Sequence, residues 1–140
     1  MALLAPNEGE LQMLRFITGN EVFEAGDTLR LKLYDNNVSP AEGDTFSTYT
    51  ESSSTGYGDT ILVGDSWTIE KSGGGDTVSA ACEQKTFTYT AGDTLYGYYI
   101  TSKDDTGDTI VLWAEEFTDG PYTIPGGGGT VKVTPRIELE

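Results

Sequence analysis

Histidine is absent from this chain of 140 residues. Its absence excludes His-based catalytic triads and the usual zinc and copper ligand sets, and it removes the commonest general base. Cysteine occurs once, as Cys82, so no intrachain disulfide can form, and we expect this residue to be a small buried hydrophobe. Basic residues are also few, eight Lys and Arg against 23 Asp and Glu, for a net charge of −15. Such a charge repels phosphate backbones and anionic lipids, so we expect neither nucleic acid nor membrane as a partner.

Long hydrophobic runs are missing as well. The longest aliphatic stretches have four or five residues, as in 109–113, whereas a helix that crosses a bilayer needs about 20. Residues 1–5 have no basic region and too few apolar residues for a secretory signal, so we expect the protein to begin in the cytoplasm where it is made. The length suits one domain, 1–140, with residues 1–9 as an N-terminal arm or first strand.

The chain is rich in one tripeptide. Gly-Asp-Thr occurs six times at spacings of 15 or 17 residues. Glycine tolerates a positive φ, aspartate hydrogen-bonds nearby backbone in a turn, and β-branched threonine favours the extended run that follows. The repeat therefore predicts turns that each lead into a strand. The copy at 43–45 has two open interpretations, a strand start or a short helical turn with Asp44 at its N-cap. The six copies are centred on Asp27, Asp44, Asp59, Asp76, Asp93 and Asp108.

Alternation of apolar and polar residues predicts the strands. Leu31 and Leu33 alternate with Arg30 and Lys32, as in a half-buried antiparallel strand. Pro135 interrupts the C-terminal run, which indicates an edge strand or a bulge. We expect an all-β protein, a single antiparallel β-sandwich of jelly-roll or Greek-key type with eight or nine short strands and little or no helix. The predicted strands are 10–17, 29–34, 60–63, 66–71, 77–82, 85–90, 95–102, 109–117 and 131–139, and the glycine run 126–129 is a short flexible connector.

Carboxylates are the remaining candidates for catalysis. Asp104 and Asp105 are adjacent, and so are Glu115 and Glu116. Neighbours on a strand point to opposite faces, so the glutamates do not share a substrate, and the aspartates have the composition of a hairpin loop. Repeated Gly-Asp turns suggest calcium ligands, but a structural role in turns is favoured. We therefore expect no catalytic residue, no metal and no cofactor.

Aromatic residues cluster at 95–100. Tyr96 and Tyr98 alternate, and on an exposed sheet face their rings would form a saccharide platform or a protein contact. Packing in the core is the favoured interpretation.

Several of these segments also carry a resemblance. Residues 95–100, 112–117, Pro125 with its glycine run, and 130–135 resemble the C-terminal half of a family of small β-proteins encoded among the structural genes of tailed bacteriophages. Residues 44–57 are similar to the middle segment of that family, so the resemblance covers about two-thirds of the chain. The loop at 72–75 departs from the pattern.

The resemblance implies a non-enzymatic virion protein of the capsid decoration (cement) type. Such a protein sits on the outside of the assembled head, contacts the major capsid protein, and is often a trimer. The alternative is a tail or fibre component that binds host carbohydrate through the tyrosines. Because apolar termini and unpaired strand edges attract partners, the arm and the C-terminal strand are the expected contacts. The candidate interface residues are Leu3, Leu4, Tyr96, Tyr98, Val131, Val133 and Pro135.

Overall fold

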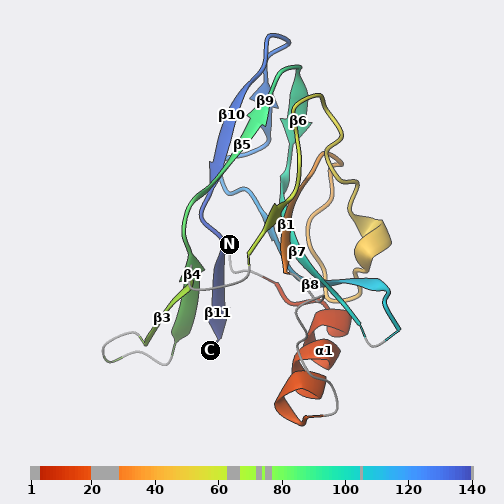
Figure 1. Cartoon of the computed structure of the whole chain (residues 1–140), viewed down its shortest axis with the longest axis vertical. Helices are drawn as coiled ribbons and strands as arrows, with labels where there is room; N and C mark the ends of the chain where they lie inside the picture. The colour runs from red at the N-terminus through yellow and green to blue at the C-terminus, as the bar shows by residue number, and fades with distance from the viewer. Residues whose placement is uncertain are drawn as a thin grey trace.

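The computed structural model describes residues 4–19, 29–62, 67–71, 74, 77–104 and 106–139. This part of the chain is mostly β, as predicted, but it also contains an α-helix (Figure 1). The elements, in chain order, are α1 (Asn7–Ile17), β1 (Arg30–Tyr34), the 3-10 helix η1 (Phe46–Thr48), β2 (Thr60–Ile61), β3 (Trp67–Lys71), β4 (Val78–Cys82), β5 (Lys85–Tyr89), β6 (Asp93–Leu95), β7 (Gly97–Lys103), β8 (Thr109–Glu116), β9 (Tyr122–Ile124), β10 (Gly129–Val133) and β11 (Arg136–Leu139).

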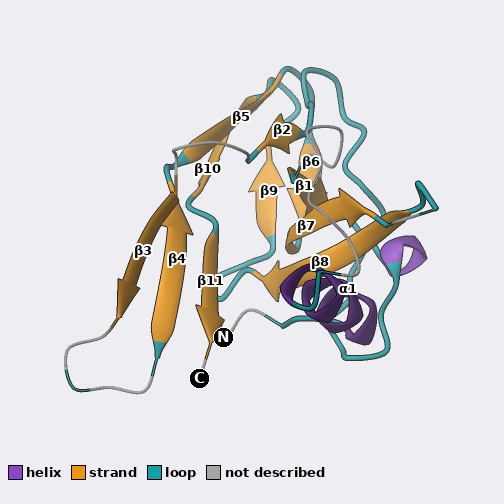
Figure 2. Ribbon diagram, turned by 60° about the horizontal axis from the view of Figure 1, so that its bottom comes forward, coloured by secondary structure: helices purple, strands orange, loops and turns teal. Residues whose placement is uncertain are grey.

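Hydrogen bonds divide the described strands into four small antiparallel sheets. The largest has the order β2-β1-β7-β8, and the second in size has the order β11-β4-β3. The pairs β10-β5 and β6-β9 form two-stranded sheets. Figure 2 shows β3, β4 and β11 side by side and set apart from the other strands. The structure thus shows several small antiparallel sheets, and it does not show the expected single sandwich.

The Gly-Asp-Thr repeat marks strand starts, as predicted. Strands β2, β4, β6 and β8 each begin at a residue within or directly after a copy of the motif. The expected positive φ is found only at Gly107 among the motif glycines that the structure describes. The copy at 26–28 and residues 75–76 of another copy lie outside the described residues.

The copy at 43–45 leads into the helical turn η1 and not into a strand. Thr45, not Asp44, occupies the N-cap, and its backbone N–H donates to the Thr48 hydroxyl. The Asp44 carboxylate instead accepts hydrogen bonds from the Tyr49 hydroxyl and the Ala41 N–H. The aspartate thus stabilises the loop rather than capping the turn.

Helix α1 overturns the prediction of a strand at 10–17 and of little or no helix. Its sequence has acidic Glu8 and Glu10 in the first turn and basic Arg15 in the last, which suits the helix dipole. Most of its residues are good helix formers, and the helix ends before Gly19, which has a φ of +70°. The apolar residues of this segment lie on two sides of the helix and do not mark one face, and we wrongly assigned them to a strand.

The N-terminal segment and α1 lie along β8, the outer strand of the largest sheet. Leu4 and Ala114 exchange two backbone hydrogen bonds, and the Glu8 carboxylate accepts one from the Val111 N–H. Gly9 sits so close that an added Cβ would lie 2.8 Å from the Leu112 Cα. Leu4 is therefore paired within its own chain, and Leu3 lies outside the described residues.

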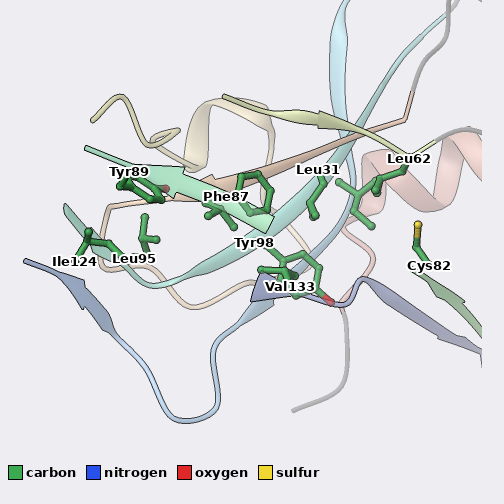
Figure 3. Close-up of a cluster of buried hydrophobic side chains, with 11 residues drawn as sticks. Leu31, Leu62, Cys82, Phe87, Tyr89, Leu95, Tyr98, Ile124 and Val133 are labelled. Atoms are coloured by element: carbon green, nitrogen blue, oxygen red, sulfur yellow. The ribbon is translucent and has the colours of Figure 1, made fainter. Parts of the chain in front are cut away.

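One face of the largest sheet contributes to the main core. Leu31, Leu33 and Ile100 are fully buried there. They pack with side chains from β5, β6, β9 and β10, and the predicted burial of Cys82 in this cluster is confirmed. Figure 3 shows this cluster, with Phe87, Tyr89, Leu95, Tyr98, Ile124 and Val133 among its members.

The opposite face of the same sheet is covered by tyrosines. Tyr34 and Tyr99 are fully buried, and the ring of Tyr49 stacks on that of Tyr99 at a centroid distance of 5.1 Å. Burial raises the pKa of all three hydroxyls far above the usual range for tyrosine. Both faces of the sheet are thus engaged within the chain.

Two predicted strands are interrupted. The segment 95–102 divides at Tyr96 into β6 and β7, which belong to different sheets. The C-terminal run divides at Thr134 and Pro135, and the Pro135 carbonyl accepts a hydrogen bond from the Cys82 N–H. Because β10 and β11 each lie at the edge of a sheet, the edge strand inferred from Pro135 is confirmed.

Candidate functional site

The sheet β11-β4-β3 has one apolar and one polar face. Its register aligns Ile69 with Ala80 and Ile137, and the adjacent row aligns Glu70 with Ser79 and Glu138. Side chains in successive rows point to opposite faces of a sheet. Trp67 lies on the apolar side, and its indole N–H donates to the Leu62 carbonyl at 2.6 Å.

The apolar face borders a groove of about 410 Å³. The opposite wall comes from α1 and β8, through side chains that include Met13, Phe16 and Trp113. Ile69 is 74% exposed, at the end of its row on the edge strand β3. The lining is Met13, Phe16, Leu29, Trp67, Ile69, Ala80, Leu112, Trp113 and Ile137.

Helix α1 extends the apolar area beyond the groove. Leu11, Leu14 and Ile17 are 52%, 59% and 80% exposed. They recur every three residues, so they form a stripe along one side of the helix. We call this stripe and the groove together the apolar surface. Exposed apolar side chains gathered in this way are typical of sites of protein–protein contact.

The predicted interface residues lie elsewhere and are mostly inside the protein. Tyr98 is 4% exposed and belongs to the main core, and Tyr96 packs with the tyrosine cluster. The two rings therefore do not share a face, and an exposed platform formed by Tyr96 and Tyr98 is contradicted. Val133 and Pro135 are also buried, and Val131 is half-buried against the core. A partner role for these residues stays a prediction without an exposed surface to support it.

The described members of the predicted carboxylate pairs are hydrogen-bonded within the chain. Glu115 accepts a hydrogen bond from the Tyr98 hydroxyl, and Glu116 accepts one from Ser39. Asp104 accepts hydrogen bonds from Thr106 and the Asp108 N–H, and these bonds lower the pKa of its carboxyl. The turn role predicted for Asp104 is confirmed, and Asp105 lies outside the described residues.

A different carboxylate interaction was not evident from the sequence. Asp35 follows β1 and Asp93 begins β6, and burial together with the negative charge of Asp93 raises the pKa of Asp35. Asp93 also accepts a hydrogen bond from Ser52, whose hydroxyl accepts one from Tyr89. The two carboxylates are 58 residues apart in sequence, and only the folded chain brings their charges into range.

We expect Asp35→Asn to change the pH dependence of stability. The folded protein keeps Asp35 protonated to a higher pH than the unfolded chain does, so its contribution to the free energy of unfolding decreases as pH rises above 3.8. The variant should lose this decrease and be at least as stable as the parent at about pH 7. Urea unfolding at several pH values tests the prediction, with Asp119→Asn on an exposed turn as the control. A steeper loss of stability with rising pH in Asp35→Asn would contradict it.

Within the described ranges, no group of three or more Asp, Glu or Cys side chains is placed to hold a metal ion. No described helix has the length and apolar character needed to cross a membrane. No protein-family model matches the sequence, and no curated protein matches it. The apolar surface is therefore the feature on which a functional interpretation depends.

Proposed function

We propose that this protein is a non-enzymatic structural component of a tailed-phage virion. In this proposal it decorates the outside of the assembled head, binds the major capsid protein and stabilises the shell. It is made in the host cytoplasm and acts on the capsid surface as a homo-oligomer, with a trimer favoured. The resemblance of residues 44–57, 95–100, 112–117 and 130–135 and of Pro125 with its glycine run supports the family, and the apolar surface supports a role in protein assembly.

The observation that carries the proposal is the exposure of large aliphatic side chains on a strongly acidic protein. Leu14 and Ile69 are both more than half exposed, on α1 and on the separate sheet. Burying such side chains is favourable by about 1.5–3 kcal/mol each. A decoration protein stabilises its shell because it binds the assembled form and shifts the equilibrium by mass action. Burial of the apolar surface against the capsid supplies the free energy for that binding.

The proposal extends to the arrangement of the sheets. The main core lies between one face of β2-β1-β7-β8 and side chains of β5 and β10, as two layers of a sandwich would place it. We infer that these two sheets act as the layers of one jelly-roll-like sandwich. The carbohydrate-binding alternative has no comparable support, because Tyr98 is buried.

Co-sedimentation with expanded phage heads that lack the protein tests this function. We expect uptake to saturate at a fixed ratio to the capsid subunit. Leu14→Glu and Ile69→Glu should each weaken binding at least about tenfold, because each places an ionised carboxylate in an apolar contact.

Ile61→Glu is the matched control. Ile61 is 45% exposed but lies on β2, away from the groove. Equal weakening by all three substitutions would indicate a general charge effect and not a specific surface. If the parent protein were absent from heads and present in purified tails, the decoration function would be wrong.

A further inference from the structure

Basic residues are rare in this protein, yet three of the eight line one cavity of about 330 Å³. Arg30 and Lys32 come from β1, and Lys103 comes from the neighbouring strand β7. The register pairs Arg30 with Thr101, so Arg30, Lys32 and Lys103 project from the same face of the sheet. The cavity lies on the same face of the sheet as the buried residues Tyr34 and Tyr99.

Two carboxylates balance only part of this charge. Asp59 lies 3.1 Å from Arg30 and 3.3 Å from Lys32, and Glu51 lies 2.6 Å from Lys32. The Lys103 ammonium donates to the Thr109 hydroxyl at 2.6 Å. It has no ion pair with a carboxylate in the part of the chain that the structure describes. The cavity therefore carries three cations against two anions.

The described carboxylate next to Lys103 in the sequence is engaged within its own loop. Asp104 directly follows Lys103, but its carboxylate accepts hydrogen bonds from Thr106 and the Asp108 N–H within the loop. The negative charge of the rest of the protein acts over longer distances, and salt at about 0.15 M screens it beyond roughly 8 Å. Local charge therefore dominates inside the cavity.

The remaining lining suits a small polar ligand. Thr101 and Thr109 contribute hydroxyl groups, and Phe46 from η1 adds an aromatic ring. The Phe46 ring is 37% exposed and is held against Tyr99 at a centroid distance of 6.4 Å. The volume is in the range of small-molecule sites, which combine a few charged groups with apolar walls.

We propose that this cavity binds the carboxylate or phosphate group of a small molecule. The oxyanion accepts hydrogen bonds from the Lys103 ammonium and the Arg30 guanidinium, and Thr109 orients the lysine. The Phe46 ring packs against the apolar part of the ligand. This function is independent of the apolar surface, which lies along α1 and the sheet β11-β4-β3.

Titration of the full-length ¹⁵N-labelled protein, followed by two-dimensional NMR at constant ionic strength, tests the proposal. Inorganic phosphate and glucuronate are the probes, and glucose is the uncharged control. We expect saturable shifts at the amides of residues 101–103 and 109 with at least one of the two anions. The anion that saturates identifies which group the ligand carries.

Lys103→Met should weaken the binding of that anion at least about tenfold, because it removes a charged donor. Lys132→Met is the matched control, since Lys132 is an exposed lysine on β10 outside this cavity. Thr109→Val is a second test, because it keeps the charge of Lys103 and removes the hydroxyl that orients this side chain. The spectra also report whether each variant is folded. The proposal is overturned if neither anion saturates, if glucose causes the same shifts, or if Lys103→Met binds as tightly as the parent.

Discussion

Gly97→Ala is expected to lower the free energy of unfolding by about 3 kcal/mol or more, the upper range for overpacking a core. An added Cβ would lie 2.6 Å from the Cε1 atom of Tyr34 and nearer still to the Glu115 carbonyl oxygen. Neither group can move easily, because Tyr34 is fully buried and Glu115 is paired with Tyr98 in the ladder between β7 and β8. Urea unfolding measures the effect directly.

Gly58→Ala is the control for this substitution. A Cβ at Gly58 would meet no atom within 4 Å, and its φ is not positive. We expect a change of no more than about 0.5 kcal/mol there, as for most surface substitutions. A loss at Gly97 as small as that at Gly58 would show that β7 and β8 do not pack as described.

Gly128→Ala is expected to cost about 2–3 kcal/mol, from a left-handed backbone and a steric clash together. Gly128 has a φ of +88°, and its Cβ would lie 2.9 Å from the Thr90 Cα and closer to the Tyr89 carbonyl oxygen. The glycine run was predicted to be a flexible connector, but this glycine forms a tight turn against the chain that follows β5.

Gly126→Ala is the control within the same run. A Cβ at Gly126 has open space around it and the φ is not positive. Alanine there reduces the entropy of the unfolded chain, so the variant should be as stable as the parent or slightly more stable. Equal losses in thermal and urea unfolding at Gly126 and Gly128 would contradict the tight turn.

The sequence predicted the features that depend on neighbouring residues. Alternation at 29–34 correctly assigned Leu31 and Leu33 to the core, and Pro135 correctly indicated an edge strand. The Gly-Asp-Thr motif located strand starts because a turn and the residue after it are set by local hydrogen bonds and backbone preferences. Such signals do not need knowledge of the rest of the fold.

Features that depend on contacts between distant segments were not predicted. The groove joins Phe16 on α1, Ile69 on β3 and Ile137 on β11, three positions with no shared local pattern. Helix α1 was missed for a related reason. Its apolar residues occupy both the groove side and the exposed side, which obscures the periodicity of an amphipathic helix.

The cationic cavity was also beyond the reach of sequence reasoning. Arg30 and Lys32 were recognised as the polar side of a strand, but Lys103 is more than 70 residues away. Only the register between β1 and β7 brings the three side chains together. Ion pairing with Asp59 and Glu51 then determines how much positive charge remains.

The contact of the N-terminal segment with β8 affects the behaviour of the protein at high concentration. An open edge strand is a template on which other chains can add strands, which leads to polymerisation and insoluble aggregates. Leu4 and Glu8 occupy backbone groups of β8 that would otherwise be available. The N-terminal segment thus blocks the addition of another strand at these positions of β8.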